Sequence, residues 1–164
     1  MAAGGLITIP SSYDAKDTAD RLDATIKARG MTVFARIDHA AGAAEAGLSL
    51  RPTELLVFGN AKGGTPLMQS NQMIGIDLPL KALVWQDETG KTWLSYNDPR
   101  WLAKRHELGS HLDPPVSAMA AGISAIAREA AGSSEFIRRT APCWARFRLS
   151  DPRWVRRTLT AIQL

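Results

Sequence analysis

The residues best suited to binding a ligand lie in the glycine-rich segment Gly59–Thr65, which follows a short apolar run. Gly59 and Gly64 have the spacing of the phosphate-binding loop G-x-x-x-x-G-K-[ST]. Thr65 occupies the lysine position of that motif, and Pro66 stands where the hydroxyl that binds Mg²⁺ is required. The segment therefore does not fit a nucleotide-hydrolysing loop of this type.

The same segment still fits a weaker binding role. Glycines allow backbone amides to turn outward, the start of a helix favours a negatively charged group, and a lysine adds positive charge. We therefore expect a small ligand, anionic or partly apolar, to bind near this turn. The expected site consists of Lys62, Gly63, Gly64 and Thr65, with His39 and Asp77 at its edge. The alternative is a strand-to-helix connection that binds nothing.

His39 directly follows Asp38 at the end of a β-rich run, which makes it the candidate general base if the protein is an enzyme. Adjacent strand residues point to opposite faces, so we do not expect Asp38 to orient this imidazole. His106 and His111 have a poor spacing for a helical metal pair. We interpret all three as surface or edge histidines and expect no metal and no cofactor. The sequence leaves open whether the protein is an enzyme.

Composition places the chain among ordinary globular proteins, with 164 residues, 45% hydrophobic and 22% charged. Its single cysteine, Cys143, excludes an internal disulfide and favours a reducing compartment. The N-terminus lacks the basic and apolar regions of a signal peptide, and no apolar run is long enough to span a membrane. We therefore expect a cytoplasmic protein without a membrane segment.

Positive charge is concentrated at the C-terminal end of the chain. Residues 135–164 contain seven arginines against two acidic residues, whereas residues 1–134 contain 13 basic and 14 acidic ones. A basic tail over residues 132–164 can attract phosphate groups, so docking to nucleic acid or to a protein is a third interpretation. The nearly neutral body argues against nucleic acid, and we favour a solvated amphipathic helix as the explanation of these charges.

Hydrophobic patterning predicts strands in residues 5–10, 31–39 and 55–60 and a hairpin over 80–97, with Gly90 at its turn. Helices are predicted in residues 11–30, 98–108 and 114–131, and a helix or loop in 40–47. A further helix should begin with Thr65 as its cap and Pro66 at its first position. This order indicates an α+β fold: a mostly antiparallel sheet with helices packed on it, a β-α-β start and one compact domain over residues 1–131.

Two expectations concern burial. The strand over residues 55–60 is a continuous apolar run, which is typical of a strand buried on both faces. In the helix that follows it, Leu67, Met68 and Met73 are expected to face the interior. The hydrophobic side of the last helix should carry Val116, Met119, Ile123 and Ile126.

Several short motifs resemble the family called domain of unknown function 302, over roughly residues 6–131. They are Asp38-His39, Pro52-Thr53, Phe58-Gly59-Asn60, the Gly-Thr-x-Leu-Met run from Gly64 to Met68, and Leu78-Pro79. The family often has a proline after the Asn, where this chain has Ala61. The resemblance implies a compact α+β domain that forms a homodimer, and it brings no established activity or catalytic residues.

Overall fold

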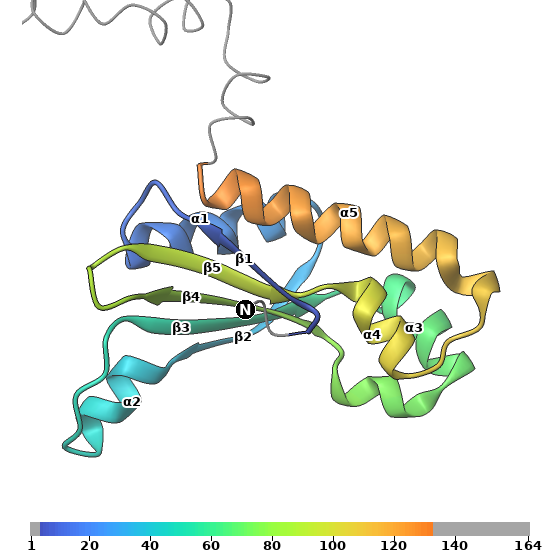
Figure 1. Ribbon diagram of the computed structural model, residues 1–164, viewed down its shortest axis with the longest axis horizontal. Helices are drawn as coiled ribbons and strands as arrows, with labels where there is room; N and C mark the ends of the chain where they lie inside the picture. The colour runs from blue at the N-terminus through green and yellow to red at the C-terminus, as the bar shows by residue number, and fades with distance from the viewer. Residues whose placement is uncertain (1–3, 133–164) are drawn as a thin grey trace, which may run out of the picture. The chain divides into compact units, whose positions relative to one another are not determined.

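A five-stranded sheet organises the computed structural model, which describes residues 4–132 (Figure 1). All neighbouring strands are antiparallel, in the order β1-β5-β4-β3-β2. The strands are β1 (Leu6–Pro10), β2 (Thr32–Asp38), β3 (Thr53–Gly59), β4 (Leu80–Gln86) and β5 (Thr92–Asn97). The α+β prediction with an antiparallel sheet is confirmed. The predicted basic tail lies outside the described residues.

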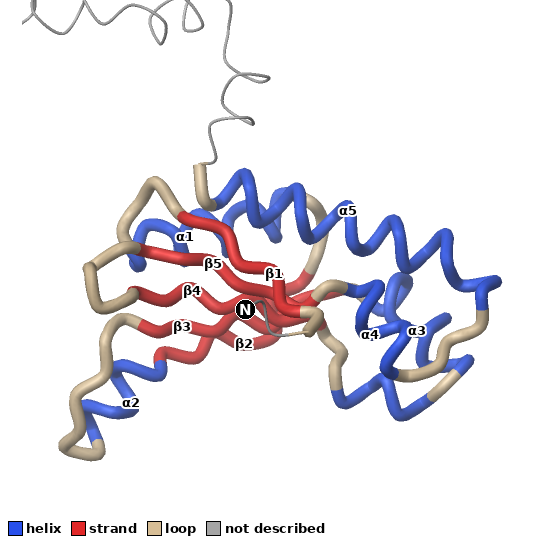
Figure 2. The backbone as a smooth tube through the Cα atoms, in the orientation of Figure 1, coloured by secondary structure: helices blue, strands red, loops and turns tan. Residues whose placement is uncertain are grey.

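Helices connect and cover these strands (Figure 2). The α-helices are α1 (Ala15–Ala28), α2 (His39–Glu45), α3 (Ala61–Ser70), α4 (Pro99–Arg105) and α5 (Asp113–Ala130), and two short 3₁₀ helices are η1 (Gln72–Ile76) and η2 (Ser110–Leu112). The predicted β-α-β start is present, but β1 and β2 form opposite edges of the sheet. Helix α1 therefore crosses from one edge to the other and contacts β2, β3, β4 and β5 on the way.

The main core lies between one face of the sheet and helices α1 and α5. Alternate residues of each strand point into it, as the twofold repeat of a strand requires. Helix α5 presents one buried side, and its apolar residues recur at helical spacing as predicted. The core includes Leu22 and Ile26 from α1, Leu56 and Phe58 from β3, Val84 and Leu94 from the hairpin, and Ile123 and Ile126 from α5.

The prediction that β3 is buried on both faces is wrong. Leu56 and Phe58 are fully buried, whereas Leu55 and Val57 on the other side of the strand remain partly accessible. The reason is that α1 and α5 cover the same face of the sheet, so the opposite face has no covering layer in one copy of the described residues. Apolar residues on both sides of this strand therefore do not mean that both sides are enclosed. We call the uncovered side the outer face.

The hairpin of β4 and β5 turns as predicted, with Gly90 at a φ of 81°. Asp87 organises this turn, because its carboxylate accepts hydrogen bonds from the Trp93 indole Nε1 at 2.7 Å and from Thr89 Oγ1 at 2.7 Å. The Lys91 backbone N–H also donates to it at 3.0 Å. These donors lower the pKa of Asp87 to about 2, with the Trp93 bond as the largest cause.

We expect the hairpin turn to weaken in acid between about pH 4 and pH 2. Because the folded pKa of Asp87 lies below its unfolded value, the carboxylate stabilises the fold above about pH 4, and this contribution disappears as the pH falls through about 2. NMR of the Trp93 indole N–H against pH measures this directly. A midpoint near 4 would contradict the prediction, and the Asp87→Asn variant is the control that should show no such step.

Candidate functional site

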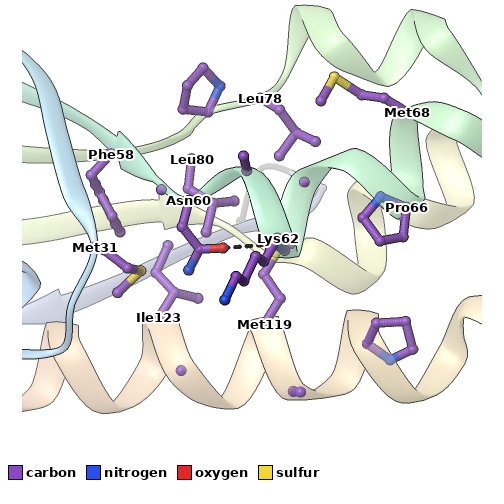
Figure 3. Close-up of a pocket in the computed structure, with 18 of the residues that line it drawn as sticks. Met31, Phe58, Asn60, Lys62, Pro66, Met68, Leu78, Leu80, Met119 and Ile123 are labelled. Atoms are coloured by element: carbon purple, nitrogen blue, oxygen red, sulfur yellow. Dashed lines mark hydrogen bonds between the residues drawn. The ribbon is translucent and has the colours of Figure 1, made fainter.

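A largely apolar groove with a volume of about 530 Å³ lies between the end of β3, the start of α3 and helix α5. Its walls include Met31 before β2, Phe58 from β3, Leu78 before β4, and Met119 and Ile123 from α5 (Figure 3). These residues come from four separate parts of the chain that the sheet and α5 bring together. The groove is therefore a product of the tertiary fold and not of one motif.

Helix α3 begins at Ala61, five residues earlier than predicted, and Asn60 is its cap. The Asn60 side-chain Oδ1 accepts a hydrogen bond from the Gly63 N–H at 2.7 Å. The prediction of Thr65 as the cap and Pro66 at the first position is therefore wrong, because asparagine is an equally good cap and comes first along the chain. Pro66 lies inside the helix and has no N–H to give to the Lys62 carbonyl one turn earlier.

Gly63 leaves room for the capping bond of Asn60. A Cβ atom at position 63 would lie 3.2 Å from Asn60 Oδ1, so a larger residue would press on the capping bond. The bond also occupies the Gly63 amide, which the sequence had offered as a ligand for an anion. An anion at this helix start would therefore depend more on a side-chain cation than on the Gly63 N–H.

Lys62 supplies the only charged side chain among the described residues that line the groove. In Figure 3 its amino group extends from the start of α3 into the space beside Asn60, Met119 and Ile123. Within residues 4–132 the Lys62 ammonium has no ion-pair or hydrogen-bond partner. The groove thus combines an apolar wall with one uncompensated positive charge, which suits a molecule with an apolar body and an anionic group.

The structure brings together only part of the expected site. Lys62, Gly63 and Gly64 line the groove, while Thr65 is exposed on the next turn of α3 and does not line it. His39 lies at the other end of the sheet. Its neighbour Asp38 pairs with Glu54 near the start of β3. The groove, in contrast, begins at Gly59, where β3 ends. Five residues of strand separate these ends by about 17 Å.

His39 is the first residue of α2, and no described residue orients its imidazole. The Asp38 carboxylate caps α2 by accepting a hydrogen bond from the Ala41 N–H at 2.9 Å. Asp38 therefore has a structural role as the cap of α2. Nothing in the described part of the chain therefore favours His39 as a general base.

Asp77 points away from the groove and toward α4. Its carboxylate lies 2.6 Å from the His106 Nε2 and 3.3 Å from the Arg105 guanidinium. The His106 side chain is only 9% exposed, so the interpretation of His106 as a surface or edge histidine is wrong. The Asn71 side-chain amide also donates to the His106 carbonyl at 2.9 Å. Asn71 and Asp77 flank η1 on either side, so both ends of η1 are bonded to His106 at the end of α4.

Sequence reasoning missed the α5 side of the groove. Gly122 lies there, and a Cβ atom at this position would meet no atom within 4 Å, so the groove is open above it. A glycine is unfavourable in the middle of an 18-residue helix, and its position between Met119 and Ile126 on the apolar side was the available signal.

Residues 4–132 lack two features that would indicate a particular function. No group of three His, Cys, Asp or Glu side chains lies close enough to hold a metal ion. No helix of this part of the chain has the length and the apolar composition needed to cross a membrane.

Comparisons with known proteins give a family, relatives and a fold. The sequence profile described as "Domain of unknown function DUF302" matches residues 7–128. A protein named "Fluoride-specific ion channel FluC 1" from Brucella suis biovar 1 (strain 1330) is 51% identical over 128 residues, which are 78% of this chain and 50% of that protein. "Fluoride-specific ion channel FluC 2" from Brucella melitensis biotype 1 is also 51% identical, over 78% of this chain and 47% of its own length.

The chain therefore spans about half the length of the curated relatives it matches. Among solved structures, an uncharacterized conserved protein DUF302 from Bacillus stearothermophilus aligns with a TM-score of 0.69 and 22% identity. The alignment covers 78% of this chain and 99% of that one. At this identity the likeness supports the fold alone.

Proposed function

The chain belongs to the family of domains of unknown function DUF302, and from this premise we propose that it binds a small, mostly apolar molecule with an anionic group. The groove beside α3 and α5 carries the proposal. Its volume of about 530 Å³ is within the range of small-molecule sites, and Lys62 is its one charged lining residue among those described. The apolar body would lie along α5 and the anionic group beside Lys62.

The lining of the groove supports binding more than catalysis. Its described residues include no histidine, carboxylate, serine or cysteine that could act as a base or nucleophile. Asn60 can offer a polar contact, but its Oδ1 is already engaged with the Gly63 N–H. What remains is an apolar surface, an amide nitrogen and an ammonium group, which can recognise a ligand but supply no acid-base pair.

A titration of the full-length protein with octanoate, followed by NMR, tests this proposal. We expect backbone amides of Lys62, Gly63, Gly122 and Ile123 to shift together, because they line one groove. A native mass spectrum of freshly purified protein would show in addition whether a ligand of this class is retained. Octanoate that leaves these amides unmoved up to millimolar concentration would refute the proposal.

Lys62→Gln should weaken octanoate binding roughly three- to tenfold and leave the binding of 1-octanol unchanged. The substitution removes the positive charge and keeps a side chain of similar length, so only the ligand with a carboxylate should respond. The matched control is Lys104→Gln, which removes an exposed charge on α4 that does not line the groove. Equal losses for the acid and the alcohol would contradict an electrostatic role for Lys62.

The Brucella relatives favour a second candidate function. Because proteins named as fluoride-specific ion channels share 51% identity with this chain over about half their length, we propose a role alongside fluoride transport. Cells that lack this chain should then be more sensitive to fluoride than cells that have it. If the same fluoride concentration inhibited the growth of cells with and without this chain, a role alongside fluoride transport would be excluded.

A homodimer and a cytoplasmic location also remain proposals. The single cysteine supports a reducing compartment, and fractionation of cells followed by detection of the chain tests the location. The homodimer was implied by the family resemblance. In this chain, an exposed apolar surface that a second copy could bury would support it.

A further inference from the structure

The outer face of the sheet carries large apolar side chains that no helix within residues 4–132 covers. They point away from α1 and α5 because side chains alternate along each strand. They surround a shallow hollow of about 320 Å³ near the middle of the face. The apolar side chains lining it are Leu6 from β1, Leu55 from β3, and Leu83 and Trp85 from β4. Trp93 extends the apolar surface by stacking on Trp85, with ring centroids 6.2 Å apart.

Several polar groups on the outer face are already hydrogen-bonded. Ser95 Oγ accepts a hydrogen bond from the Trp85 Nε1 at 2.9 Å and lies 2.8 Å from Thr8 Oγ1. The Trp93 Nε1 donates to Asp87. Lys81 is the only charged residue that lines the hollow among those described. A surface of this kind fits an apolar partner that brings few hydrogen-bonding groups of its own.

The segment of residues 39–50, which we call the arm, consists of α2 and the loop that follows it. None of the α2 residues is buried, and Leu48 and Leu50 in the loop are 68% and 47% exposed. Figure 1 shows α2 projecting beyond the ends of β2 and β3, away from α1 and α5. A helix of seven residues is marginal without packing, so the arm would gain stability from a surface that it could contact.

We propose that the arm of one copy of this chain seats Leu48 and Leu50 in the outer-face hollow of a second copy, and that the second copy does the same in return. One chain carries both the projecting apolar residues and the hollow, and the fold leaves both uncovered. In a dimer with a twofold axis, the arm of each copy can contact the hollow of the other copy at the same time. Glu45 is the only acidic residue of the arm and Lys81 the only base of the hollow, so the charges also match.

This interface is independent of the ligand proposed for the groove. The hollow lies on the outer face, whereas the groove is formed with α3 and α5. Failure of octanoate to bind would therefore leave the dimer untouched, and a monomeric protein would leave the groove untouched.

The first test is the oligomeric state of the full-length protein over a dilution series, measured by light scattering after size exclusion. We expect a dimer that the double variant Leu48→Asp, Leu50→Asp weakens by at least about a hundredfold, since it places two carboxylates against an apolar hollow. The matched control is Met73→Asp, Ile76→Asp. It alters residues that are 71% and 75% exposed in η1, outside the arm and the hollow. The expectation that Met73 faces the interior is therefore wrong.

A monomeric wild-type protein at all concentrations would overturn the proposal. A dimer that the arm variant leaves intact, or that both double variants weaken equally, would also overturn it. All four altered residues are exposed, so the variants should fold, and circular dichroism checks this. Each outcome therefore supports the arm as the contact or removes it.

A cross-link then tests where the arm lies. In a Cys143→Ser background, Leu48→Cys combined with Leu83→Cys should form covalent dimers on mild oxidation, because a disulfide needs Cα atoms within about 7 Å. Met73→Cys combined with Leu83→Cys is the control and should remain monomeric under the same conditions. If the first pair formed its disulfide within one chain, or formed none, the arm would not lie in the hollow of a second copy.

Discussion

Replacing Gly122 with leucine should reduce octanoate affinity at least about a hundredfold while the protein remains folded. A Cβ atom at this position meets no atom within 4 Å, and Gly122 lines the groove, so the new side chain extends into the volume that the ligand needs. Glycine inside a helix costs about 1 kcal/mol relative to alanine, so the substitution also removes an unfavourable residue from α5. We therefore expect no loss in the free energy of unfolding.

The matched control for this experiment is Ala121→Leu, one residue earlier in the same helix. Ala121 is exposed and does not line the groove, so the added side chain should lie in solvent. Isothermal titration calorimetry gives the affinity, and urea unfolding gives the stability of each variant. If the Gly122→Leu protein bound octanoate as tightly as the Ala121→Leu protein, the ligand would not occupy this groove.

Asp77→Ala should lower the free energy of unfolding by about 1.5–3 kcal/mol. The carboxylate bonds to His106 at 2.6 Å, and both side chains are nearly buried, so the substitution leaves a buried imidazole without its partner. It also removes the partner of Arg105. The cost arises mainly from the unsatisfied His106, since exposed pairs of the second kind contribute little.

Urea unfolding of Asp77→Ala and of Asp23→Ala gives the comparison that decides this point. Asp23 pairs with Lys27 one turn away on the exposed side of α1, and its loss should cost less than about 0.5 kcal/mol. Equal destabilisation by the two variants would mean that the bond between η1 and α4 contributes no more than a surface ion pair.

Local patterns in the sequence predicted most of the fold. The apolar spacing in α5 and the glycine of the β4–β5 hairpin each depend on a few neighbouring residues, and the structure confirms both. The start of α3 could not be fixed in the same way. Asn60 and Thr65 are both good caps, and a proline after Thr65 favoured the wrong one, because the capping bond to Gly63 is visible only in three dimensions.

The sequence predicted the residues of the candidate site that are neighbours in the chain, but not those that only the fold brings together. Lys62, Gly63 and Gly64 are neighbours in sequence and line one groove, as a local motif would. His39 was expected at the edge of the same site, yet the antiparallel register of β2 and β3 puts it at the opposite end of the sheet. The α5 side of the groove involves residues more than fifty positions away, which no local pattern connects to Lys62.

The position of β1 at the edge of the sheet has a consequence for folding during synthesis. Strands β2 to β5 pair with their neighbours in chain order, so each can join the sheet as it leaves the ribosome. Strand β1 is made first, but its partner β5 lies about ninety residues later, with Leu6 opposite Asn97. Among the strands of this sheet, the first to be synthesised is thus the last to be paired, and it stays an unpaired apolar segment until the hairpin is complete.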